Sequence, residues 1–127
     1  MTRRYLPEPW RIVPSDGGHV TVRVEGYVEG TGTLVKPDGL GRLRVQVAAG
    51  DGRLDLLDLE GRCIGHVGGP WPRLLQDELR RCAREGVTPV VRASLVGPRG
   101  ERNMFVMLAW PSQRTAAQRQ PALTGRR

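Results

Sequence analysis

The chain has 127 residues, of which 39% are hydrophobic, enough for one ordinary globular core but not for two. It contains no apolar run of about 18 residues that could cross a bilayer, and its start, MTRRYLPEPW, has no apolar block typical of a secretory signal. Its two cysteines, Cys63 and Cys82, are too few for a disulfide framework. We therefore predict a single-domain cytoplasmic protein in which both cysteines are thiols.

The formal net charge of +7 is concentrated at the two ends of the chain. All acidic residues fall between Glu8 and Glu101. Six of the twenty basic residues lie in the two tails, where there is no acidic residue; these six are Arg3, Arg4, Arg114, Arg119, Arg126 and Arg127. Without them, fourteen basic residues face thirteen acidic ones, and the body is nearly neutral. All basic residues but one are arginines, which fits bidentate phosphate contacts or, equally, the codon usage of a GC-rich genome.

Residues 1–9 are predicted to form an extended arm, because MTRRYLPEPWRIVP holds three prolines in fourteen residues. Tyr5, Leu6 and Trp10 are the side chains that could hold this arm against the body of the protein.

The next residues alternate between apolar and polar side chains, which is typical of half-buried strands. Residues 19–27, HVTVRVEGY, and 42–47, RLRVQV, show this clearly. RLDLLDLEG begins in the same way and changes phase at Leu57, which indicates a bulge or a bend. VVRASLV and MFVMLAW complete the set, and the glycine-rich GPRGERN between them predicts a hairpin loop.

One helix is predicted from about Pro72 to Glu85, ended by Gly86 in a left-handed conformation. Its apolar face consists of Leu75, Leu79, Cys82 and Ala83. Its opposite face carries Arg73, Arg80 and Arg84 with Asp77 among them. This face is either an ordinary solvated surface or a row of cations that follows a phosphate backbone.

Five to seven strands and one helix predict a mainly β (α+β) fold, a small OB-like, partly closed β-barrel over residues 10–111. Residues 112–127, SQRTAAQRQPALTGRR, lack hydrophobic periodicity and acidic residues and are expected to be a disordered, arginine-rich tail. This tail is either a solvated end or an arm that contacts phosphates without sequence preference.

Cys63 and His66 raise the question of a metal site. Three positions apart on a regular strand, they would point to opposite faces, and with Cys82 and His19 they form no recognised zinc spacing. We expect no metal and no cofactor, both cysteines as small buried hydrophobic residues, and His66 free to donate to a phosphate or to stack on a base. An enzyme is not expected, because the chain lacks a nucleophile elbow and a phosphate-binding loop.

Residues 57–97, LDLEGRCIGHVGGPWPRLLQDELRRCAREGVTPVVRASLVG, resemble the second half of a HIRAN domain of the free-standing bacterial or phage type. The resemblance implies an OB-like barrel over residues 10–111, a role in DNA repair and binding of the 3′-hydroxyl end of single-stranded DNA. His66 occupies the position of the family's histidine or tyrosine after the glycine. Where the family carries an Asn-Pro-Tyr-Asp-like stretch, this chain has VAAGDGRL, which lacks the aromatic and acidic pair of the end-binding pocket.

Two functions follow as hypotheses. The first is a non-catalytic DNA-binding module, for single strands or DNA ends. Its expected surface consists of Arg42, Arg44, Arg62, His66, Trp71 and Arg73, aided by Arg114, Arg119, Arg126 and Arg127 of the tail. The second is a protein-interaction module of a larger DNA-processing or phage machine, which the nearly neutral body favours. Neither hypothesis involves a membrane or a small-molecule substrate.

Overall fold

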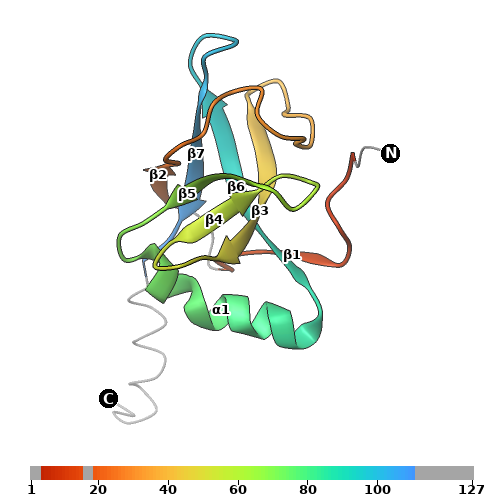
Figure 1. The fold of residues 1–127 in the computed structure, drawn as a ribbon, viewed down its shortest axis with the longest axis vertical. Helices are drawn as coiled ribbons and strands as arrows, with labels where there is room; N and C mark the ends of the chain where they lie inside the picture. The colour runs from red at the N-terminus through yellow and green to blue at the C-terminus, as the bar shows by residue number, and fades with distance from the viewer. Residues whose placement is uncertain (1–3, 16–18, 111–127) are drawn as a thin grey trace, which may run out of the picture.

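The structure is a computed structural model that describes residues 4–15 and 19–110. The elements in chain order are β1 (Trp10–Ile12), β2 (Val20–Arg23), β3 (Arg42–Ala49), β4 (Leu54–Leu57), β5 (Cys63–Val67), α1 (Trp71–Glu85), β6 (Thr88–Val96) and β7 (Asn103–Leu108) (Figure 1). The predicted mainly β fold with one main helix is confirmed. The predicted tail, 112–127, lies outside the described residues.

All seven strands belong to one curled sheet. Its order is β2-β7-β6-β3-β4-β5, and β1 adds to β6 as a parallel partner. The two outer strands approach each other, because the chain just after β2 forms an antiparallel bridge to β5 between Glu25 and His66. Two backbone hydrogen bonds make this bridge, of 2.8 and 2.9 Å. The sheet therefore forms the small, partly closed barrel that the alternation predicts.

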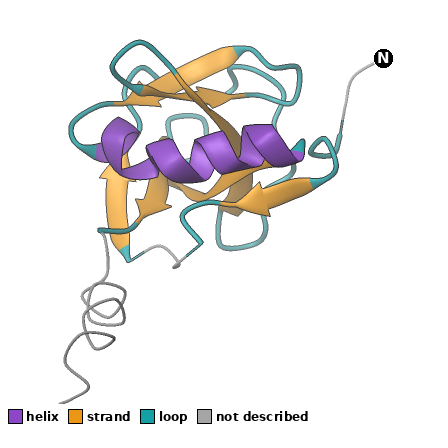
Figure 2. Cartoon of the chain, turned by 90° about the horizontal axis from the view of Figure 1, so that it is seen from below, coloured by secondary structure: helices purple, strands orange, loops and turns teal. Residues whose placement is uncertain are grey.

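The core fills the inside of this barrel and is closed at one end by α1, which lies across the strands (Figure 2). The apolar positions of the strands point inward, as predicted, with Leu43, Val45 and Val47 of β3 all buried. The helix begins at Trp71, one residue before the predicted start, and ends at Glu85 as predicted; it is followed by Gly86, whose φ of 69° is the expected left-handed stop. Leu75, Leu79 and Cys82 are buried as predicted, but Ala83 is exposed.

A bulge in β5 changes the direction of its side chains. The register shifts between Leu56 and Leu57, where two residues of β5, Cys63 and Ile64, face one residue of β4. An irregularity at Leu57 was predicted and is present, but the extra residue lies in β5, whereas β4 keeps a regular alternation with Leu57 half-buried. The bulge also places Cys63 and His66 on the same side of the sheet, since their partners on β4 are two residues apart. The prediction that they point to opposite faces is wrong, because it assumed a regular strand.

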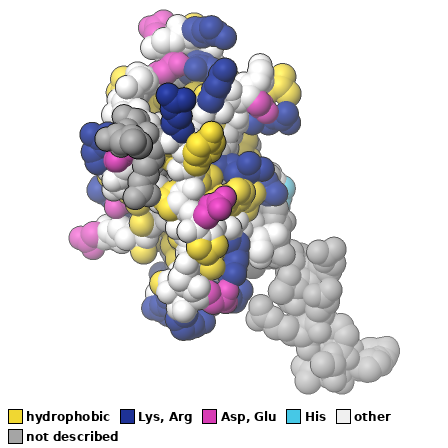
Figure 3. Space-filling model, turned by 90° about the vertical axis from the view of Figure 1, so that its right-hand side faces the viewer, with side chains coloured by type: hydrophobic (Ala, Val, Ile, Leu, Met, Phe, Trp, Pro, Cys, Tyr) yellow, Lys and Arg dark blue, Asp and Glu magenta, His cyan; other side chains and the backbone are white. Residues whose placement is uncertain are grey.

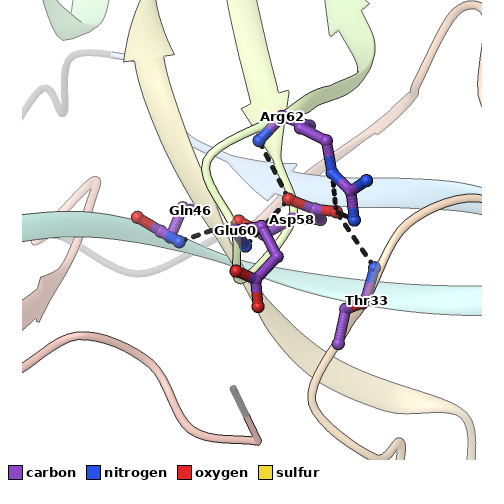
Figure 4. Close-up of polar contacts among 5 residues, drawn as sticks. All are labelled: Thr33, Gln46, Asp58, Glu60 and Arg62. Atoms are coloured by element: carbon purple, nitrogen blue, oxygen red, sulfur yellow. Dashed lines mark hydrogen bonds and ion pairs between the residues drawn. The ribbon is translucent and has the colours of Figure 1, made fainter. Parts of the chain in front are cut away.

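The buried carboxylate of Asp58 connects the turn after β4 to the long loop between β2 and β3 (Figure 4). One carboxylate oxygen accepts the backbone N–H groups of Glu60 and Arg62, each at 2.9 Å. The other accepts the backbone N–H of Thr33 at 3.0 Å and lies 3.2 Å from the Arg62 guanidinium. The loop held in this way continues to Lys36 and Asp38, which contribute to the site below.

Within residues 4–15 and 19–110, no helix is both long and apolar enough to cross a membrane.

Candidate nucleic-acid interface

A groove of about 800 Å³ lies between the N-terminal arm and the outer face of β3 and β6. We call it the arm groove and define it by six of its lining residues: Tyr5, Trp10, Lys36, Arg42, Arg44 and Arg92. Figure 3 views the molecule from the side on which the arm lies in Figure 1, and on this face basic, acidic and hydrophobic side chains are interspersed.

The arginines of the arm groove are placed by strand alternation. On β3, Leu43 and Val45 point into the core, so Arg42 and Arg44 point outward. Arg44 pairs directly with Arg92 of β6 in the antiparallel register, which puts two like charges opposite each other. Such a cross-strand pair is unfavourable by itself, and a bound anion between the two guanidinium groups would relieve the repulsion.

The cations of the groove differ in how far the protein itself neutralises them. Arg42 forms a 2.8 Å ion pair with Asp38, whose pKa is lowered chiefly by the backbone N–H of Arg42. Among the described residues, Arg92 and Lys36 have no ion-pair partner. The positive charge available to a ligand therefore lies on Lys36, Arg44 and Arg92.

Two aromatic side chains border these cations. The guanidinium carbon of Arg44 lies 5.2 Å from the centre of the Trp10 ring, a cation–π contact that holds this arginine at the groove. The Tyr5 side chain is 81% exposed. The prediction that Tyr5 holds the arm is therefore not met. Instead, Trp10 and the backbone attach the arm: β1 pairs with β6, and the N–H of Thr88 donates to the carbonyl of Pro9.

The arm groove thus combines the two chemistries that single-stranded nucleic acids require. Arginine and lysine side chains can bind successive phosphates, and an exposed ring can stack on an unpaired base. Glu8 and Asp38 also line the groove, but Asp38 is already paired with Arg42.

The structure does not bring the predicted site residues together on one surface. Arg42 and Arg44 lie in the arm groove, whereas Arg73 lies in a second groove beside α1. Arg62 lies in the turn before β5 and pairs with Asp58. His66 is half-buried in β5, where its backbone forms the bridge to Glu25 that closes the barrel.

Trp71 does not have the exposure that a stacking residue needs. Its side chain is only 7% exposed, and its ring packs on Trp110, with 4.6 Å between the ring centres. The tail residues Arg114, Arg119, Arg126 and Arg127 lie outside the described residues.

Sequence reasoning missed Arg92 and Lys36 and gave Tyr5 and Trp10 only an anchoring role. A signal for Arg92 was present, because it occupies an outward position of VVRASLV just as Arg44 does in RLRVQV. That these two positions face each other depends on strand pairing, which alternation alone does not reveal.

The described residues contain no group of three or more His, Cys, Asp or Glu side chains that could hold a metal ion. Cys82 is buried as predicted, whereas Cys63 is exposed, with its sulfur 3.3 Å from the carbonyl oxygen of Gly65.

Comparisons with protein-family models, with curated proteins and with solved structures find no match to this chain. The HIRAN resemblance therefore stays a prediction.

Proposed function

We propose that this protein is a non-catalytic module that binds single-stranded DNA in the arm groove. The observation that carries the proposal is the direct pairing of Arg44 with Arg92 on adjacent strands. The two guanidinium groups repel each other in the free protein. A phosphate bound between them would make their proximity favourable.

A single strand fits this groove better than a duplex does. The ring of Tyr5 is offered to solvent at the side of the groove, where it can stack only on a base that is not already stacked in a helix. Because the body is nearly neutral overall, these cations form a local positive cluster that can attract phosphates. The resemblance to HIRAN domains supports DNA as the ligand.

We expect Arg92→Glu to weaken DNA binding and at the same time to raise the stability of the fold. The substitution replaces a repulsive cross-strand pair by an attractive one, which should add about 0.5 kcal/mol to the free energy of unfolding. It also removes a phosphate contact and adds a repulsive charge, so affinity for an oligothymidylate of about 12 nucleotides should fall at least about tenfold. Fluorescence anisotropy at low salt and urea denaturation measure the two effects.

Arg99→Glu is the matched control for this experiment. Arg99 is exposed in the turn between β6 and β7, does not line the arm groove, and undergoes the same change of charge. It should leave affinity within about twofold of the wild-type value, since charges far from the contact are screened. An equal loss of affinity in both variants would show that net charge, and not the groove, drives binding.

A further inference from the structure

The second groove lies on the side of the barrel closed by α1 and also has a volume of about 800 Å³. It arises because β3 and β6 diverge. Their ladder ends at the pair of Gln46 with Val90, although β6 begins two residues earlier; β1 pairs with β6 along its other edge. Helix α1 crosses the gap, and the surface between the helix and the ends of β3 and β4 is what we call the helix groove.

The helix groove has an apolar lining and a purely basic set of charges. The apolar residues that line it include Ala48, Leu57, Leu79, Ala83 and Val87. The charged residues that line it are three arginines, Arg53, Arg73 and Arg80, and no acidic residue lines it.

Two of these arginines are available to a ligand. Arg53 is already engaged by Asp55 at 2.8 Å. Arg73 and Arg80 are exposed and have no ion-pair partner in the part of the chain that the structure describes. They are seven positions apart on α1, about two helical turns, and therefore lie along one edge of the groove.

We propose that the helix groove docks an acidic amphipathic segment of a partner protein. Apolar side chains of the segment would cover Leu57, Leu79 and Val87, and its carboxylates would pair with Arg73 and Arg80. The charges exclude the chain's own last residues as the occupant, because residues 112–127 carry four arginines and no acidic residue. A nucleic acid fits less well, because no aromatic side chain lines this groove to stack on a base.

A labelled synthetic peptide of about 14 residues tests this proposal, with leucines repeated at helical spacing on one face and glutamates on the other. Fluorescence anisotropy should show saturable binding to the full-length protein. Arg73→Glu with Arg80→Glu should weaken binding at least about tenfold, because both charge contacts become repulsive. A peptide with serines in place of the leucines should also lose binding.

Arg81→Glu with Arg84→Glu is the matched control, since both residues are exposed on α1 and neither lines the helix groove. Arg84 lies one helical turn from Arg80, so a small loss is expected, but this variant should lose much less affinity than the Arg73 and Arg80 variant because its charges do not contact the bound segment. Equal losses in the two double variants, or no saturable binding to the wild type, would overturn the proposal.

The two grooves can be tested independently. Arg92→Glu should weaken DNA binding and leave peptide binding intact, because Arg92 lines the arm groove and not the helix groove. A contrary result is that the wild type binds oligothymidylate but not the peptide, and that the Arg73 and Arg80 variant loses the oligothymidylate binding. That result would assign the helix groove to nucleic acid and contradict a protein partner.

Discussion

Replacement of Asp58 by alanine should lower the free energy of unfolding by about 3 to 5 kcal/mol, because it removes a buried carboxylate on which three backbone donors depend. The Asp58 side chain is fully buried and accepts hydrogen bonds from the backbone N–H groups of Thr33, Glu60 and Arg62. Alanine would leave these donors without their acceptor and would free the loop before β3. Urea denaturation measures the loss. Asp51→Ala, at an exposed turn position, is the control and should cost less than about 0.5 kcal/mol.

The cost of losing the Asp58 carboxylate should also depend on pH. Burial alone would raise the pKa of Asp58, but the backbone N–H groups of Arg62, Thr33 and Glu60 outweigh it, and the pKa is lowered. The folded pKa therefore lies below the unfolded one. The stabilisation is complete above the unfolded pKa of about 3.9 and is lost as the pH falls through the folded value. The difference in free energy of unfolding between the wild type and Asp58→Asn should therefore become smaller in acid. A difference that stayed constant with pH would contradict this account.

Gly65→Ala should lower the free energy of unfolding by about 3 kcal/mol, because the added methyl group has no space where the barrel closes. Its carbon would lie 2.5 Å from a methyl carbon of Val24 and 2.9 Å from the carbonyl oxygen of Glu25. That carbonyl accepts the N–H of His66, so relief of the contact would separate β5 from the chain after β2.

Gly68→Ala is the matched control for Gly65→Ala. A methyl carbon at Gly68 would meet no atom within 4 Å, and its backbone does not need the left-handed conformation. The control should be nearly neutral. Denaturation compares the two variants, and hydrogen exchange of the Glu25 and His66 amides reports whether the barrel has opened. Equal stability of Gly65→Ala and wild type would show that the closing bridge contributes little.

The elements that depend on local chemistry could be predicted from the sequence. The alternation in RLRVQV follows from which side chains avoid water, and the stop of α1 at Gly86 follows from glycine's tolerance of a left-handed backbone. The sequence predicted an irregularity near Leu57 but placed it in the wrong strand, because β5 carries the extra residue while β4 alternates regularly. The effect of the bulge on Cys63 could therefore not be predicted.

The candidate site was harder to predict, because it depends on contacts between distant segments. Arg44 meets Arg92 only through the register of β3 on β6. The Trp71 ring packs on Trp110, which follows β7 in the sequence. The burial of Trp71 could therefore not be inferred from the residues around it. Arg42, Arg44 and Arg73 look alike in the sequence, but the first two lie on β3 in the arm groove and Arg73 lies on α1 in the helix groove.

The central claim, that single-stranded DNA binds in the arm groove, is tested most directly by an NMR titration of isotope-labelled protein with oligothymidylate at low salt. We expect the largest shift changes at the indole N–H of Trp10 and at the backbone amides of Arg44 and Arg92, with α1 unaffected. Changes confined to Arg73 and Arg80 of α1, or no change at any oligonucleotide concentration, would contradict the claim.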